Sequence, residues 1–293
     1  MTNSFVIAIL AGLGAMLGWG ISDFFGKKAV DKVSDVVFLF WLQLVGFIAI
    51  FVYVVFFGQW ALAPVEKTPQ IFVMAGVNLL ASYLFYRALK KGKVSVISPI
   101  NASYAIFTIP ISIFFFQEHV SRSVLFLLAI VTLGVLLTSL DIKGIAKDGF
   151  DRKDLSKGVP DVLLNVLLLS IWIPFWDQFL SSNNWLMSLF LFKVMIMAIL
   201  VIFVLVKKIN LKINDKKIFK WIIISGLLYS VGYISFDWGF GTTPHTSLIT
   251  ALSATFPAPT LLLSRIFLKE KLQLTQWAGV GLILGSLVVL GFI

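Results

Sequence analysis

Four charged side chains interrupt long apolar runs of this sequence. Three are carboxylates: Asp23 in "GWGISDFF", Asp177 in "IWIPFWDQF" and Asp237 in "YISFDWGF". The fourth is the base Lys193 in "LFLFKVMIM". A charge at such a place is costly unless it is paired or faces a polar cavity. Each of the four is therefore a candidate for binding a cation or a proton, or for an ion pair that acts as a gate.

Asp23 allows two interpretations. Lys27 follows it by four residues, and an acid placed one turn before a base favours an ion pair on the helix surface. Alternatively, Asp23 shares a helix face with Trp19, and Ser22 adds a hydroxyl beside it. A carboxylate and an aromatic ring on one face would suit a site for a cation or a proton.

Asp237 follows Tyr229 and Tyr233 at four-residue spacing, so the three side chains share one helix face. They form either a binding wall with one carboxylate and two phenols, or a packing contact in which the phenols donate to a buried carboxylate. Lys193 is predicted to pair with Asp237 or Asp177. Asp177 lies near the end of its apolar run, close to the expected lipid interface.

The sequence gives little support for enzyme chemistry. It has no cysteine, and its two histidines, His119 and His245, lie far apart, so no metal-ligand spacing occurs. No Gly-x-x-x-x-Gly-Lys-Ser/Thr segment for nucleotide binding is present. A membrane-embedded aspartyl protease remains a remote alternative, because neither Asp23 nor Asp237 lies in a Gly-x-Gly-Asp context. We expect no catalytic residue, no metal and no cofactor.

The elements that carry these residues are predicted to be membrane-spanning helices. The chain of 293 residues is 59% hydrophobic and 13% charged, with a mean hydropathy of +0.98, whereas soluble domains have about 25% charged residues. The first apolar run lacks the basic start of a signal peptide, so we interpret it as a span. Ten runs are long enough to cross a bilayer: 5–26, 36–57, 70–89, 94–117, 123–140, 160–180, 185–206, 219–241, 246–268 and 273–293.

Lysine and arginine fall almost entirely on one side of the predicted membrane. Of the 24 such residues, 21 lie in loops on one side, and the other side has only Lys67 and Arg122. This bias marks the cytoplasmic side, so we predict a multi-pass protein of the cell (inner) membrane with both termini extracytoplasmic. The net charge of +10 then reflects topology, and no nucleic-acid partner is expected. Asp23 would lie about one turn inside the cytoplasmic boundary, where it would line or latch an entrance.

The two halves of the chain repeat each other. When residues 87–120 are shifted by 152, Ser98 meets Thr250, Thr108 meets Thr260 and Glu118 meets Glu270. A repeat of five spans must be inverted in the membrane, and a site at the interface of inverted repeats is typical of transporters. We predict a first repeat at 1–140, a cytoplasmic linker at 141–159 and a second repeat at 160–293. Prolines in the fourth and ninth spans are expected to interrupt those helices.

The segment "ALKKGKVSVISPI" at 88–100 and the glutamates that end the fourth and ninth spans carry a resemblance. With the ten spans and the repeat, the chain resembles the EamA-type transporters of the drug/metabolite transporter superfamily. The resemblance implies an all-α membrane fold of ten helices in two inverted five-helix repeats around a central cavity. It also implies that the first, third, fourth, sixth, eighth and ninth spans surround that cavity. The candidate substrate-binding residues on those spans are Trp19, Asn78, Asn101, Tyr104, Trp172, Trp176, Tyr229, Tyr233 and Asp237.

These observations lead to an expected function. We expect a secondary transporter, most simply an exporter, of a small polar or amphipathic metabolite such as an amino acid or organic amine. Its alternatives are a facilitative uniporter or a proton-coupled importer of an organic cation, with a channel or membrane-embedded enzyme less favoured. Asp23, Lys193 and Asp177 are the candidate gate or ion-pair residues. The expected partners are a small-molecule substrate, the lipid bilayer and, as a candidate coupling ion, the proton, with the protein acting as a monomer.

Overall fold

The computed structural model describes residues 3–139, 158–267 and 273–290, and these residues form helices without any strand. Side chains cap several of the helices at their first turn: Ser34 accepts from the backbone N–H of Val37, and Asn184 accepts from that of Met187. The helices are α1 (Asn3–Val30), α2 (Asp35–Phe57), η1 (Trp60–Leu62), η2 (Val65–Lys67), α3 (Thr68–Lys91), α4 (Val94–Ala102), α5 (Tyr104–Phe115), α6 (Arg122–Ser139), α9 (Val159–Ser181), α10 (Trp185–Val206), α11 (Lys216–Thr242), α12 (Thr246–Ser253), α13 (Pro257–Phe267) and α14 (Leu274–Leu290).

Eight segments of the described residues are long and apolar enough to cross a membrane, and α6 and α14 contribute two shorter apolar helices. The pair α4 and α5 makes one of the eight segments, and the pair α12 and α13 makes another. Large apolar side chains point outward, as with Phe115 at 80% exposure and Leu205 at 69%. Such an apolar exterior suits lipid and not water. The prediction of an all-α membrane protein is confirmed.

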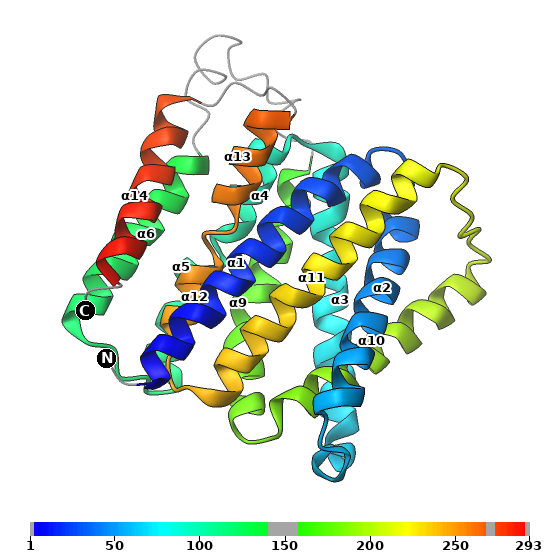
Figure 1. Ribbon diagram of the computed structural model, residues 1–293, viewed down its shortest axis with the longest axis horizontal. Helices are drawn as coiled ribbons and strands as arrows, with labels where there is room; N and C mark the ends of the chain where they lie inside the picture. The colour runs from blue at the N-terminus through cyan, green and yellow to red at the C-terminus, as the bar shows by residue number, and fades with distance from the viewer. Residues whose placement is uncertain (1–2, 140–157, 268–272, 291–293) are drawn as a thin grey trace.

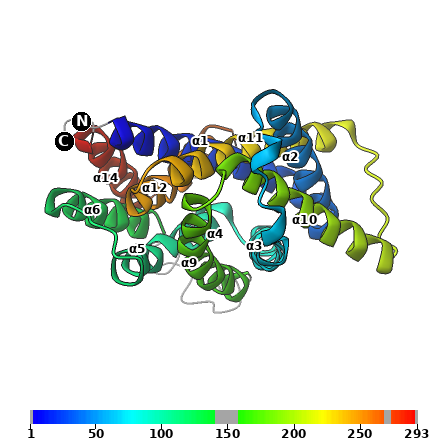
Figure 2. The ribbon, with the colours of Figure 1, turned by 90° about the horizontal axis from the view of Figure 1, so that it is seen from below.

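The main helix contacts between the two halves have counterparts in which the halves change roles. In the first half α1 packs on α11, and in the second half α9 packs on α3. Likewise α2 contacts α11 as α10 contacts α3, while α6 and α14 pack on each other. Figure 2 shows α1 and α11 facing α3 and α9 across the middle of the bundle. This exchange of partners is what two inverted five-helix repeats require, and that prediction is also confirmed.

Close backbone contact joins α1 to α11 (Figure 1). A Cβ atom on Gly18 would lie 2.6 Å from the backbone nitrogen of Gly232, so only glycine permits this approach. One turn further on, Ser22 and Ser225 each donate a hydroxyl to the other's carbonyl oxygen, both at 2.9 Å. These contacts fix the rotation of α1, and with it the direction in which Trp19 and Asp23 point.

The fourth and ninth spans are both interrupted, as predicted, and the breaks lie at matching places. The prediction that prolines cause the break in the fourth span is wrong, because Pro99 and Pro110 lie inside α4 and α5. The first break lies at Ser103, between α4 and α5, and the second covers 254–256, between α12 and α13. A shift of 152 residues places the first break within the second. Pro257 begins α13, where its fixed φ angle suits a helix start. The two broken helices also touch, because α5 packs on α12.

The bundle has two ends that differ in their charged residues. The basic end is where α1 and α3 finish and α9 begins, and the opposite end is where α2 finishes and α10 and α12 begin. The predicted linker at 141–159 lies almost wholly outside the described residues, as does Glu270. The division into repeats at 1–140 and 160–293 therefore stays a prediction.

Candidate functional site

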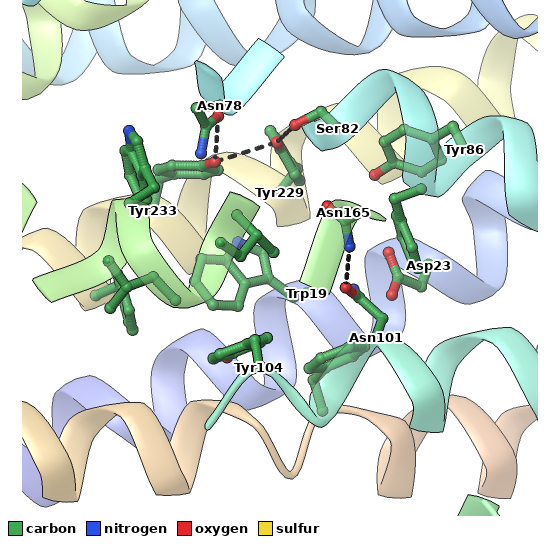
Figure 3. Close-up of a pocket in the computed structure, with 16 residues that line it drawn as sticks. Trp19, Asp23, Asn78, Ser82, Tyr86, Asn101, Tyr104, Asn165, Tyr229 and Tyr233 are labelled. Carbon is green, nitrogen blue, oxygen red and sulfur yellow. Dashed lines mark hydrogen bonds between the residues drawn. The ribbon is translucent and has the colours of Figure 1, made fainter. Parts of the chain in front are cut away.

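A cavity with an empty volume of about 620 Å³ lies between the two halves (Figure 3). Helices α1, α3, α4, α5, α9 and α11 contribute to its wall. Of the nine residues predicted to bind substrate, seven line it: Trp19, Asn78, Asn101, Tyr104, Trp172, Tyr229 and Tyr233. Trp176 and Asp237 do not, whereas the predicted gate residue Asp23 does.

One wall of the cavity is a hydrogen-bonded row of phenols and polar groups between α3 and α11. The Tyr233 hydroxyl donates to Asn78 Oδ1 at 3.0 Å, and the Tyr229 hydroxyl donates to that of Tyr233 at 3.3 Å. Ser82 lies 3.3 Å from the Tyr229 hydroxyl (Figure 3). Because Asn78 and Ser82 are four residues apart, both point from one face of α3. The row fixes the orientation of both tyrosine rings toward the cavity.

Lys193 lies behind this wall and is 1% exposed. Its ammonium donates to Gln43 Oε1 at 3.2 Å and lies 3.8 Å from the centroid of the Tyr233 ring. No carboxylate oxygen of the described residues lies within 4.0 Å of it. The expected ion pair with Asp237 or Asp177 is therefore not a direct contact among the described residues, although the Asp237 carboxylate interacts with the Lys193 charge at longer range. An amide oxygen and the electron-rich faces of tyrosine rings contact the ammonium directly.

Asp237 is fully buried, with 0% exposure, outside the cavity lining. Its Oδ1 accepts a hydrogen bond from Trp176 Nε1 at 3.1 Å, and its Oδ2 has no partner among the described residues. The Trp176 ring stacks on Trp172, with 5.5 Å between ring centroids and 17° between planes. Trp172 faces the cavity, and Trp176 and Asp237 lie behind it. Both had been predicted to line the cavity, but they form a second layer outside its wall.

Asp23 is 4% exposed and lines the cavity (Figure 3). No hydrogen bond or ion pair joins it to any described residue, although Lys27 is one turn away. Lys27 pairs with Asp31 at 2.8 Å and donates to the carbonyl of Leu89 at 2.6 Å, so the interpretation of an Asp23–Lys27 pair is wrong. The carboxylate of Asp23 points from α1 into the cavity, and its expected role at an entrance stays a prediction.

Trp19 lies one turn before Asp23 and lines the same cavity. Its ring meets that of Tyr233 edge-on at 5.6 Å and that of Phe236 at 4.9 Å. The indole nitrogen is buried and has no hydrogen-bond partner among the described residues. The predicted face of Trp19 and Asp23 on the first span is therefore present as one side of the cavity.

The remaining polar lining joins the two repeats. Asn165 donates a hydrogen bond to Asn101 Oδ1, so that α9 is linked to α4 (Figure 3). Sequence reasoning missed Asn165, although it is a lone amide in the apolar run "DVLLNVLLL". It also missed Ser82 and Tyr86, which follow Asn78 at four and eight residues and line the cavity from one face of α3.

Ion pairs link the two halves at the basic end of the bundle. Asp161, at the start of α9, accepts hydrogen bonds from Arg87, and from Lys91 at 2.7 Å. Arg87 follows Tyr86 in sequence, and Asp161 is one turn before Asn165, so this cluster lies next to the cavity. It was not predicted, because its members are separated by about seventy residues of chain.

Carboxylates accept hydrogen bonds at the opposite end. Asp177, predicted as a gate residue, accepts from the Thr246 hydroxyl at 2.6 Å, and both residues belong to the second half of the chain. Glu118 accepts from the backbone N–H of Ser247 at 2.9 Å and from its hydroxyl at 2.5 Å. Glu118 thus caps α12, as expected for a helix-end glutamate. Burial raises the pKa of Glu118, and the two hydrogen bonds from Ser247 oppose that shift.

Known proteins resemble this chain in sequence and in fold. The model of the EamA-like transporter family matches residues 6–140 and 156–292. An "Uncharacterized protein MJ1333.1" of Methanocaldococcus jannaschii is 36% identical over 92 residues, which are 31% of this chain and 66% of that protein. A solved structure described only as a crystal structure of a protein superimposes with a TM-score of 0.75 at 14% identity. The superposition covers 96% of this chain and 95% of the other chain, so the two share the same fold.

The family model thus spans both halves, and each match contains one set of five predicted spans. The match agrees with the exchanged helix contacts and with the cavity between the halves. The chain is an integral membrane protein and belongs to the EamA-like transporter family.

Proposed function

We propose that this protein is a secondary transporter that moves a small polar or amphipathic metabolite by alternating access. The observation that carries the proposal is a cavity lined by both inverted repeats. A cavity at such an interface can be exposed to either side of a membrane when one repeat rocks against the other.

The contacts at both ends support this mechanism, because each end has contacts that cross from one repeat to the other. At the basic end, Arg87 and Lys91 of the first repeat bind Asp161 of the second. At the opposite end, Lys67 donates to Asn183 at 2.9 Å. Transport would then require the two sets of contacts to break in turn.

The basic end is proposed to face the cytoplasm, following the positive-inside rule. We propose export of an amino acid or organic amine as the simplest role, driven by a substrate or proton gradient, because the sequence has no nucleotide-binding segment. Facilitative uniport and proton-coupled import of an organic cation are the alternatives. The protein is proposed to act as a monomer, with Asp23, Lys193 and Asp177 as the charged residues to test for gating.

Counterflow in proteoliposomes tests the proposal. Purified protein would be reconstituted with a trapped unlabelled solute, and uptake of the same labelled solute would be followed for amino acids, amines and nucleosides. Saturable uptake that trapped solute accelerates is expected for at least one class. Uptake that rises linearly with the external solute concentration and does not depend on trapped solute would instead indicate a channel.

A further inference from the structure

We propose that the cavity is a site for protonated aromatic amines, with the ammonium at the Asp23 carboxylate and the ring against Trp19. This inference rests on the proposed transport function, because it names the substrate class of the same cavity. Three features of the lining carry it: its charge, an unpartnered polar atom and the spacing of acid and ring.

The charge of the lining is the first feature. Among the 16 residues that the structure places around the cavity, Asp23 is the one acid, and no lysine, arginine or histidine joins it. The other titratable groups there are tyrosines, which are neutral near pH 7. Lys193 is separated from the cavity by the Tyr229 and Tyr233 rings, and Lys27 is engaged with Asp31. A buried carboxylate without a counter-ion is costly, and a cationic ligand would remove that cost.

An unpartnered polar atom near Asp23 is the second feature. The Tyr86 hydroxyl is buried without a hydrogen-bond partner among the described residues. Asp23 and Tyr86 lie at the same side of the cavity in Figure 3. Native interiors rarely leave polar atoms unsatisfied, so such a group often marks a binding site. An ammonium has three donors, which the carboxylate and the phenol oxygen can accept together.

The spacing of acid and ring is the third feature. Asp23 and Trp19 are four residues apart on α1, about 6 Å along the helix axis. An aromatic ring joined to an ammonium by a two-carbon chain has a comparable reach. Phe236 and Tyr233 extend the aromatic surface beside Trp19, at 4.9 and 5.6 Å between ring centroids. Aromatic faces attract both ring systems and cations.

Amino acids fit this lining less well than amines. Their carboxylate would need a basic partner, and the lining offers only neutral donors such as the amides of Asn78 and Asn101. It would also repel the Asp23 charge in a site of low dielectric constant. Binding of a zwitterion should therefore be weaker than that of the matching amine.

Calorimetric titration of the purified full-length protein at pH 7 tests the proposal with four probes that share a phenyl ring. Phenethylamine is cationic, 2-phenylethanol neutral, phenylacetate anionic and phenylalanine zwitterionic. A charge-assisted contact predicts that phenethylamine binds at least about ten-fold more tightly than the others. In Asp23→Asn this preference should disappear, whereas Asp31→Asn, the same change on an exposed carboxylate of the Lys27 pair, should keep it.

The fold of Asp23→Asn is checked by thermal unfolding, where we expect a midpoint no lower than that of the wild type because a buried charge is removed. Phenethylamine affinity within about two-fold of the wild type in this variant, or equal or absent binding of all four probes to the wild type, would overturn the proposal. Counterflow measurements distinguish a failure of the proposed amine site from a failure of the proposed transport function. Transport of neutral or anionic solutes that Asp23→Asn leaves intact would overturn the amine site alone. Amine binding without any counterflow would overturn the transport function alone.

Discussion

The hydroxyl of Tyr104 and the Oγ atom of Ser253 lie 3.1 Å apart, and each belongs to one of the two helix breaks. Tyr104 begins α5 directly after the first break, and Ser253 ends α12 directly before the second. Both side chains are buried, and Tyr104 also lines the cavity. A single hydrogen bond therefore ties the irregular part of one repeat to that of the other at the cavity wall.

We predict that this bond couples the two breaks. Tyr104→Phe should lower the free energy of unfolding by about 1 kcal/mol, the usual value of one buried hydrogen bond. Ser253→Ala should lower it by at least as much, because it also removes the bond from the Ser253 hydroxyl to the Thr250 carbonyl. The double variant should lose little more than Ser253→Ala alone, because Tyr104→Phe removes an interaction that Ser253→Ala has already removed. Urea or thermal unfolding of the four proteins in one detergent measures the coupling. Strictly additive losses would show that the two hydroxyls act independently.

The ion cluster at the basic end should control access to the cavity. Asp161→Asn removes the charge that holds Arg87 and Lys91, so the basic end should open more often. Because the chain has no cysteine, a single Ser82→Cys reports on the cavity without background. The rate of labelling by a charged, membrane-impermeant thiol reagent applied at the basic end should rise several-fold when Asp161→Asn is added.

Asp31→Asn in the same Ser82→Cys background is the control for the labelling rate. It removes an ion pair at the same end, but that pair links Lys27 only to its own helix region. Its labelling rate should match that of the parent. Equal rates in the Asp161 and Asp31 variants would mean that the cluster is no barrier to the cavity.

Much of this architecture follows from local patterns in the sequence. Apolar runs predict the spans, and the internal repeat agrees with the corresponding breaks at Ser103 and 254–256. Helical spacing predicts that Tyr229 and Tyr233 point the same way, as they do in the cavity wall. These features depend only on residues within one helix or on a comparison of two segments.

The choice between the carboxylates could not be predicted in this way. Asp237 was favoured over Asp23 by its place within its apolar run, yet Asp23 lines the cavity and Asp237 lies outside the lining. The outcome depends on how α1 and α11 are rotated against each other, which close contacts such as that between Gly18 and Gly232 determine. Such a contact joins residues more than two hundred positions apart, so the hydrophobic periodicity of either helix cannot reveal it.

Gly232 should be required for the position of Trp19. A Cβ atom added to Gly232 would lie 2.4 Å from the Trp19 indole, so Gly232→Ala must displace the ring or separate the helices. We expect a loss of about 1–3 kcal/mol in stability, as for other overpacked sites. Gly76→Ala is the matched control, because nothing lies within 4 Å of its added Cβ and alanine favours a helix. Its unfolding temperature should stay the same or rise slightly, and similar losses in both variants would refute the packing argument.

Glu118 should make stability depend on pH. Burial raises its pKa in the folded protein, with Ser247 opposing the shift, so the folded state holds the proton more tightly than the unfolded chain does. The contribution of Glu118 to the free energy of unfolding is then fully present below the ordinary glutamate pKa of about 4.3. It is lost as the pH rises through the pKa that Glu118 has in the folded protein. Unfolding temperatures between about pH 4 and pH 8 should fall less steeply in Glu118→Gln than in the wild type. Glu66→Gln, an exposed glutamate near the same end, should leave the wild-type slope unchanged, and a Glu118→Gln slope equal to that of the wild type would contradict the raised pKa.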